Sequence, residues 1–317
     1  QVTPDIWNRV RRQVDDRDEK GQFILTGSAR PRDDARRHSG AGRFSVMQMR
    51  PMSLFESGHS TGEMSLASLL EGERQTGRGT HLSFDELLRR IITGGWPELL
   101  DADEDFARDW LADYLRQVVE VDVPEMGHRR NPGNLRRLLE ALGRGVGQPV
   151  KLSDLAKDVG GDGGPIAYET LTGYLDALAR LWLTDDSAAW RPHMRSRARL
   201  RTAPVRYFID SSIGPAALNI GSAELKADPL ALGFHFEALV IRDLRIYAQL
   251  HRGHVDSWRD ENGNEVDAVL TARDNKWAAF EVKLNPRDVD AGAAALLKFA
   301  RNVDTDRHKE PACLGVI

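Results

Sequence analysis

The last third of the chain combines one long apolar helical pattern with short strand-like stretches, which limits the folds that it can adopt. The predicted helix covers residues 233–250, and the stretches with strand patterns are 254–259, 265–270 and 277–284. Residues 261–264 contain an Asn-Gly pair and suit a tight turn, because both residue types tolerate positive φ. A second helix from Val289 to Arg301 and a final strand follow. A small α/β unit is therefore expected.

Charged residues interrupt the stretch 277–284, which otherwise has the composition of a buried strand. Successive side chains of a strand point to opposite faces, so Glu281 and Lys283 share one face with Trp277. Phe280 and Val282 share the other face, which we expect to be the core. The polar face is then either a solvated surface or half of a metal-dependent site.

The stretch 265–270 adds a further carboxylate. Simple alternation places Asp267 and Val269 on one face and Val266, Ala268 and Leu270 on the other. If this strand pairs with the stretch 277–284, Asp267 lies beside Glu281 and Lys283. Glu237, in the preceding helix, is a further candidate for the same place.

Oxygen ligands of this kind suit Mg²⁺, and a phosphodiester supplies further oxygens. We therefore predict a catalytic set of Glu237, Asp267, Glu281 and Lys283, with Asp267 and Glu281 as the metal ligands. Lys283 would neutralise developing negative charge. The alternative is a hairpin whose outer face is simply polar.

The middle of the chain has the layout of a winged helix-turn-helix. Its predicted helices are 132–144, 153–159, the latter capped by Ser153, and 167–181. Two strand-like stretches, "LWLTDD" and "VRYFID", then flank a basic segment. Arg195, Arg197 and Arg199 are its candidates for DNA binding, although winged helices also bind proteins.

The N-terminal part begins with an amphipathic helix over residues 3–16, and strands are expected at Gln22–Leu25 and Phe44–Met49. Residues 56–79 have weak patterning and are expected to form a surface excursion. Ser83 and Glu86 predict a capping box for a helix that ends at Gly94-Gly95, and a long helix follows from Glu104 to about Val121.

Two resemblances follow from these motifs. Glu237, Asp267 and the Glu281-Val-Lys283 triplet resemble the motif of the PD-(D/E)XK nuclease superfamily. The series "GQFILTGSAR", "GRFSVMQMRPMSLFE", "ITGGWPELL", "WLADYLRQVVEVDV", "VRYFIDSSI", "LGFHFEALVIRDL" and "NEVDAVL…AAFEVKL" resembles prokaryotic AAA-type ATPases that carry a C-terminal domain of unknown function with a nuclease-like fold.

The resemblance implies an α/β multidomain protein of three parts. Residues 1–128 would be a truncated P-loop ATPase remnant with a helical extension, 129–225 a winged-helix-like domain, and 226–317 a restriction-endonuclease-like α/β unit. Thr26 and Ser28 would match the polar positions that sense the nucleotide, and Arg43 would face a phosphate. A chain starting at Gln1 and stopping at Ile317 is expected to be cut at both ends.

The sequence departs from that family in one decisive respect. It contains no G-x-x-x-x-G-K-[ST] loop and no Gly-Lys dipeptide, and no apolar strand in it ends in the Asp-Glu pair that would hold Mg²⁺. Such a loop is the basis of nucleotide affinity in P-loop proteins. We therefore expect ATP to bind only to the intact parent protein.

Composition narrows the remaining choices. Cys313 is the only cysteine, which excludes an intramolecular disulfide, and no apolar run approaches the ~20 residues that span a bilayer. These features favour a cytoplasmic protein without a membrane partner. Three functions remain open: part of a DNA-associated AAA-type ATPase, a Mg²⁺-dependent nuclease, and a non-enzymatic interaction module that contacts a protein or a second copy of the chain.

Overall fold

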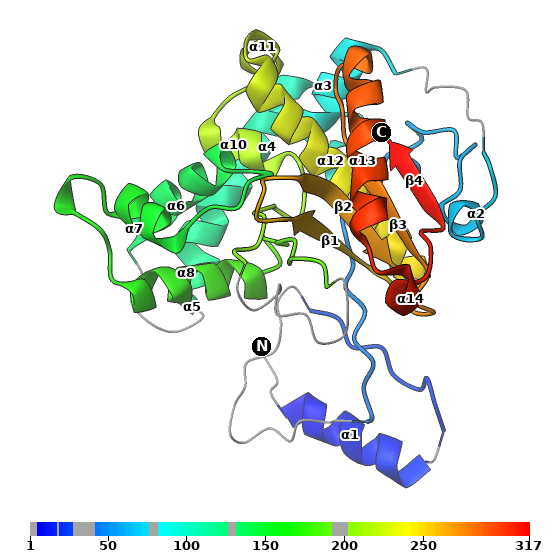
Figure 1. Cartoon of the computed structure of the whole chain (residues 1–317). Helices are drawn as coiled ribbons and strands as arrows, with labels where there is room; N and C mark the ends of the chain where they lie inside the picture. Colours follow the sequence, from blue (N-terminus) through cyan, green and yellow to red (C-terminus); the bar gives the residue numbers. More distant parts are fainter. Residues whose placement is uncertain (1–4, 18, 28–41, 76–81, 126–130, 192–201) are drawn as a thin grey trace. The chain divides into compact units, whose positions relative to one another are not determined.

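The computed structural model describes residues 5–17, 19–27, 42–75, 82–125, 131–191 and 202–317. The chain divides into two compact units, Gln1–Arg50 and Pro51–Ile317 (Figure 1). No helix within the described ranges is both long and apolar enough to cross a membrane.

The first unit contains helix α1 (Asp5–Arg17), close to the predicted bounds. Trp7 of this helix stacks on Phe44 with ring centroids 3.9 Å apart. The strands predicted at Gln22–Leu25 and Phe44–Met49 are absent: both stretches are irregular, and Ile24, for example, is 91% exposed. A strand needs a partner for its N–H and C=O groups, and the described residues of this unit supply none.

The second unit begins with helices and continues into a sheet. Its α-helices are α2 (Leu66–Leu70), α3 (Phe84–Thr93), α4 (Glu104–Gln117), α5 (Val123–Glu125), α6 (Pro132–Arg144), α7 (Leu152–Gly160), α8 (Tyr168–Arg180), α10 (Ile213–Leu218), α11 (Ser222–Ala227), α12 (Pro229–Leu250), α13 (Val289–Asn302) and α14 (Thr305–His308). Short 3₁₀ turns cover Pro97–Leu99, Gly161–Gly163 and Pro286–Asp288, and a π-helical turn covers Val118–Asp122.

The helix predictions are largely confirmed. Ser83 and Glu86 form the predicted capping box of α3, and α6 has the predicted bounds. Two details are wrong. Lys151, rather than Ser153, stands at the N-cap of α7, and the excursion over residues 56–79 contains α2, whose Leu70 is buried in the core.

Helices α6, α7 and α8 share one hydrophobic core with residues from α4 and α10. After α8 in the sequence, the two stretches predicted as strands lie antiparallel but are joined only by isolated bridges, Thr184 with Phe208 and Ser187 with Val205. We call these two stretches the bridged pair. The three helices and the bridged pair follow one another in the predicted order (Figure 1).

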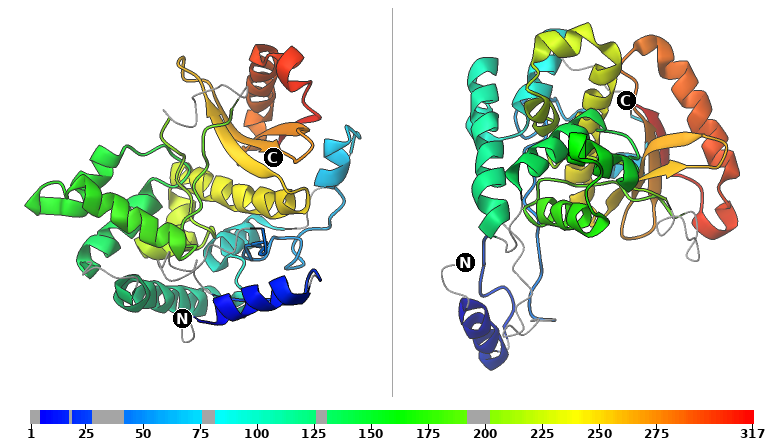
Figure 2. Two further views of the ribbon diagram at one scale, coloured as in Figure 1. Left: turned by 90° about the horizontal axis from the view of Figure 1, so that it is seen from below. Right: turned by 90° about the vertical axis from the view of Figure 1, so that its left-hand side faces the viewer.

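The sheet has the strand order β1-β2-β3-β4. Its strands are β1 (His254–Arg259), β2 (Glu265–Thr271), β3 (Trp277–Glu281) and β4 (Cys313–Val316). β2 pairs antiparallel with both β1 and β3, whereas β4 pairs parallel with β3. Helices α12 and α13 lie on opposite sides of this sheet (Figure 2).

Both faces of β3 are therefore core, and the prediction of one polar face is wrong. Phe280 packs in the cluster with α12 and Trp277 in the cluster with α13, and all five residues of β3 are buried. Helices that cover both faces of a sheet exclude water from both. The two charged residues of the predicted polar face lie at the end of the strand: Glu281 is its last residue, and Lys283 lies beyond it.

A β-bulge interrupts the alternation of β2. One residue of β1, Ser257, stands opposite two residues of β2, Asp267 and Ala268. Val266 and Val269, three positions apart, consequently pack in the same core cluster. The prediction that placed them on opposite faces is wrong for this reason.

A buried polar network ties distant segments of the second unit together. Oδ2 of Asp210 accepts hydrogen bonds from the Gly95 N–H at 2.9 Å and from Nη1 of Arg242 at 3.1 Å. Arg242 also pairs with Asp243, whose Oδ2 accepts from the Leu54 N–H at 2.8 Å. The helical part and α12 are thus joined by charged hydrogen bonds within the protein interior.

The Gly94-Gly95 pair has a role beyond ending α3. Gly94 has a φ of +70°, and a Cβ there would lie 1.9 Å from Oδ1 of Asp210. A Cβ on Gly95 would lie 2.1 Å from the Met52 carbonyl oxygen. Both positions require glycine because other groups occupy the space of a side chain.

Trp190 joins the bridged pair to the sheet. Its N–H donates to the Ser257 carbonyl at 2.6 Å, and its indole Nε1 donates to Oγ1 of Thr271 at 3.2 Å. Its ring packs with those of Trp277 and Phe299, with centroids 5.2 and 5.7 Å away. The edge strand β1 is therefore covered by a segment that precedes α12 in the sequence.

Candidate functional site

Asp267 and Glu281 lie side by side on paired strands. Ala268 pairs with Phe280 at the end of the antiparallel register of β2 and β3, and Asp267 and Glu281 are the next residues along the two strands. Oδ2 of Asp267 accepts a hydrogen bond from the Val282 N–H at 2.8 Å, which fixes the carboxylate at the end of β3.

Lys283 lies beyond the end of β3 and is held by the C-terminal segment. Its backbone N–H donates to the Ile317 carbonyl at 2.8 Å, and the Ile317 N–H donates to the Glu281 carbonyl at 2.8 Å. Its Nζ is 2.7 Å from Oε2 of Glu281. The Lys283 side chain is 30% exposed, so its ammonium links a buried carboxylate to the surface.

The Glu281 carboxylate is buried with one oxygen left open. The side chain is only 4% exposed, and Oε1 has no hydrogen-bond partner among the described residues. A buried polar atom without a partner is costly and calls for an explanation. A cation or a ligand donor at Oε1 would supply one.

Glu237 reaches the same place from α12. Its Oε1 accepts a hydrogen bond from the hydroxyl of Tyr207, in the bridged pair that precedes α12. The charges of Asp267 and Lys283 both act on Glu237. The four residues predicted from the sequence therefore belong to one electrostatic cluster, which we call the carboxylate site.

Burial and mutual repulsion shift the carboxyl groups of this site toward the neutral form. Burial, followed by the charge of Asp267, raises the pKa of Glu237 to about 8, against the hydrogen bond from Tyr207. The same two causes raise the pKa of Glu281 to about 7. Burial also raises the pKa of Asp267, partly offset by the Val282 N–H and by Lys283. Crowded carboxyls of this kind compete for protons near neutral pH.

The pKa of Lys283 shifts in the opposite direction from that of a lysine that is merely buried. Burial lowers its pKa, but the hydrogen bond to Glu281 and the charges of Glu281, Asp267 and Glu237 outweigh burial and raise it. The lysine is thus held in its charged form beside these carboxyl groups. A divalent cation would relieve the same repulsion.

The carboxylate site holds fewer protein ligands than a closed metal cage. Across the described ranges, no group of three or more His, Cys, Asp or Glu side chains is arranged to hold a metal ion. Mg²⁺ usually binds through one or two carboxylates and keeps waters or substrate phosphates as its other ligands. The neighbouring pair Asp267 and Glu281 fits that mode.

The other predicted site residues belong to the first unit or lie outside the described residues. Thr26 is exposed in an irregular stretch, and Arg43 pairs with Asp15 of α1. Ser28 and the three arginines Arg195, Arg197 and Arg199 lie outside the described residues.

Tyr207 contacts the carboxylate site but was not predicted from the sequence. It belongs to the stretch "VRYFID", whose alternation indicates a strand and nothing more. The β-bulge at Asp267 was also not predicted, because no Gly or Pro in the sequence marks it. Only the packing of α12 against both the sheet and the bridged pair brings Tyr207 to Glu237.

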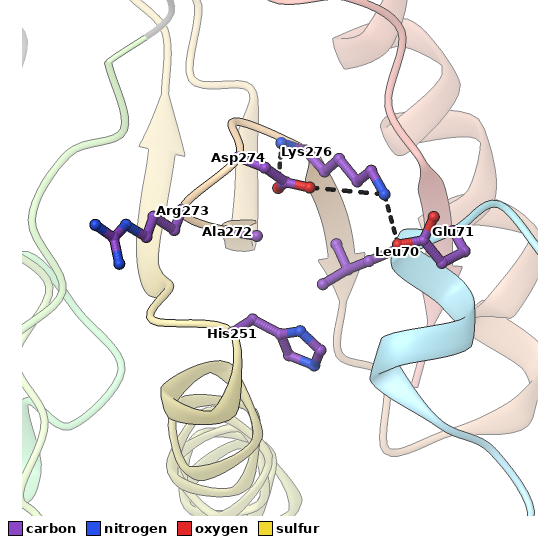
Figure 3. Close-up of a pocket in the computed structure, with 7 residues that line it drawn as sticks. All are labelled: Leu70, Glu71, His251, Ala272, Arg273, Asp274 and Lys276. Carbon is purple, nitrogen blue, oxygen red and sulfur yellow. Dashed lines mark hydrogen bonds and ion pairs between the residues drawn. The ribbon is translucent and has the colours of Figure 1, made fainter.

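A separate cavity of about 480 Å³ lies at the opposite end of the β2–β3 hairpin (Figure 3). It is lined by Leu70, Glu71, His251, Ala272, Arg273, Asp274 and Lys276. Nζ of Lys276 is 2.5 Å from Oε1 of Glu71 and 3.6 Å from Oδ2 of Asp274. These three charged side chains of the cavity therefore largely neutralise one another. No residue of the carboxylate site lines this cavity.

The chain is similar to two families of domains. Residues 84–224 match a domain of unknown function (DUF8612). Residues 232–314 match another domain of unknown function (DUF4143), which is commonly found in AAA-ATPase-associated proteins. No curated protein and no solved structure matches the chain. All four residues of the carboxylate site, Glu237, Asp267, Glu281 and Lys283, fall within the second match, whereas Tyr207 falls within the first.

Proposed function

We propose that the carboxylate site binds Mg²⁺ and hydrolyses a phosphodiester, so that the part of the chain that contains the sheet, residues 226–317 (the sheet unit), is a metal-dependent nuclease. One observation carries the proposal: Asp267 and Glu281 follow the last residue pair of β2 and β3, the charge of Asp267 acts on Glu281, and Oε1 of Glu281 is buried without a hydrogen-bond partner among the described residues. Lys283 stands 2.7 Å from the same carboxylate. Carboxylate pairs with an adjoining lysine suit the handling of a metal ion and a phosphate together.

Each residue of the site has a distinct part in this proposal. Asp267 and Glu281 would hold the ion. Lys283, which is part-exposed, would face the phosphate and neutralise charge that develops on it. Glu237 would accept or return a proton from its buried position. Bound Mg²⁺ would supply Lewis-acid polarisation of the phosphoryl group and an activated water.

The test is cleavage of duplex, single-stranded and branched DNA by the full chain with Mg²⁺ or Mn²⁺. Lys283→Ala and Asp267→Asn should each lower cleavage by roughly 10²–10³-fold. Lys276→Ala is the matched control, because Lys276 lies at the other end of the same hairpin and pairs with Glu71. No cleavage by the natural chain, or equal cleavage by Lys283→Ala, would reject the proposal.

We also infer that the chain acts within a DNA-associated AAA-type ATPase system. The match at residues 232–314 supports this inference, as does the order of α6, α7, α8 and the bridged pair, which suits a winged helix. In this interpretation residues 1–128 derive from an ATPase core and its helical extension. Titration with MgATP and with DNA tests the two parts separately.

A further inference from the structure

Glu237 is held by a buried tyrosine from another part of the chain. Tyr207 is 3% exposed, and its hydroxyl donates to Oε1 of Glu237. It lies in the segment matched by the first domain family, whereas Glu237 lies in the second. The carboxylate site therefore includes a side chain from outside the sheet unit.

Tyr207 is itself held in place by a charged neighbour. The guanidinium carbon of Arg245 lies 5.1 Å from the centroid of the Tyr207 ring. Nη2 of Arg245 donates to Oγ of Ser187 at 2.6 Å, and Nη1 is 3.4 Å from Oδ2 of Asp185. Arg245 and Glu237 both lie on α12, so one helix holds the ring and presents the carboxylate to its hydroxyl.

The backbone at Gly147 also restricts the same carboxylate. A Cβ on Gly147 would lie 3.3 Å from Oε1 of Glu237, so the carboxyl group sits closely against this glycine. The Gly147 N–H donates to the Arg206 carbonyl at 2.9 Å, next to Tyr207 in sequence. Glu237 is thus confined by two segments of the first matched region.

We propose that Tyr207 is a positioning residue of the carboxylate site: its hydroxyl holds Oε1 of Glu237 and so fixes the orientation of this carboxyl group. The proposal rests on the function proposed above. It makes the site composite, so that the region 232–314 is incomplete without the segment that contains Tyr207. The hydroxyl also favours the ionised form of Glu237, because it donates a hydrogen bond to it.

The first test needs neither metal nor DNA. The free energy of unfolding in urea is measured with EDTA from pH 5 to pH 9.5 for the natural chain and for Tyr207→Phe, Glu237→Gln and the double variant. The groups that act on Glu237 are Tyr207, Asp267, Glu265 and Lys283. Of these, the Phe variant changes only the hydroxyl.

If the proposal holds, the pH window in which Glu237 ionises moves upward in Tyr207→Phe by roughly one unit, and the shift is absent in the Glu237→Gln background. Tyr174→Phe is the control, because Tyr174 is also buried and its hydroxyl accepts from the Asn131 N–H at 3.1 Å. A uniform loss of stability at every pH would show a merely structural role and overturn the proposal.

The second test uses cleavage. The pH–rate profile of Tyr207→Phe should move to higher pH while that of Tyr174→Phe stays in place. If the natural chain cleaves no DNA but the unfolding data show the shift, the nuclease function fails and the Tyr207–Glu237 coupling stands. If cleavage occurs with an unshifted profile in Tyr207→Phe, the positioning role fails and the nuclease function stands.

Discussion

Nη1 of Arg242 lies 3.1 Å from Oδ2 of Asp210, and the two side chains are 2% and 0% exposed. Asp210 belongs to the first matched segment and Arg242 to the second. The two matched regions therefore share a fully buried ion pair, which ties the helical part to α12. A charge buried in this way is stable only with its partner.

Replacement of Arg242 by Met should destabilise the second unit by about 3–5 kcal/mol, because Asp210 would keep a buried charge without its cation. Arg144→Met is the control: its pair with Asp158 is exposed on the surface and should contribute only about 0–1 kcal/mol. Urea unfolding followed by circular dichroism measures both. Equal effects of the two substitutions would contradict the assignment.

The metal-free chain should lose stability as the pH rises from about 5 to about 8. The pKa of Glu237 is raised from 4.5 to about 8 in the folded chain, so the folded state binds a proton that the unfolded state has already released. The stabilisation is complete below the unfolded pKa and is lost as the pH passes through the folded value.

Glu237→Gln should flatten this decline, by on the order of 2–4 kcal/mol at pH 8 relative to pH 5. Glu140→Gln, an exposed substitution on α6, should leave it unchanged. The measurement is the free energy of unfolding in urea across this range. An identical slope in Glu237→Gln and the natural chain would show that Glu237 is not the titrating group.

Mg²⁺ should bind more tightly at pH 8 than at pH 6, because protons compete with the cation for carboxyl groups, and Glu281 titrates near 7. Isothermal titration calorimetry should show this pH dependence, and Asp267→Asn should weaken binding at least about tenfold. Asp274→Asn, on the exposed turn of the same hairpin, serves as the control. Affinity that does not depend on pH would place the ion elsewhere.

MgATP should show no specific binding to this chain in calorimetry. The reason lies in the sequence: no phosphate-binding loop with its lysine occurs in the 317 residues, and such loops supply the backbone N–H groups and the charge that hold the phosphates. Submillimolar affinity would reveal a nucleotide site of another kind.

Replacement of Arg195, Arg197 and Arg199 by Ala should weaken binding to duplex DNA. If each contacts one phosphate, the slope of log K against log salt should fall by roughly three units at ~0.9 per phosphate. Fluorescence anisotropy at several salt concentrations measures the slope. An unchanged slope would assign these arginines to the surface rather than to DNA.

The sequence by itself determined the local elements of the second unit. Ser83 with Glu86, and the Asn-Gly turn between β1 and β2, act through hydrogen bonds and backbone preferences within a few residues. The helix α3 and the β1–β2 hairpin were therefore predicted close to their observed bounds. The sequence also predicted that Asp267 could lie beside Glu281, and these two residues follow the last pair of the β2–β3 register, Ala268 with Phe280.

Only the tertiary structure decided what surrounds those elements. Strand patterns at Gln22–Leu25 and Phe44–Met49 did not become strands, because a strand exists only with a hydrogen-bonding partner that its own sequence does not contain. The two covered faces of β3 and the bulge at Asp267 likewise depend on α12, α13 and β1, which lie far away in sequence. The same holds for Tyr207, which lies 30 residues before Glu237 in the sequence and contacts it only because α12 packs against the bridged pair.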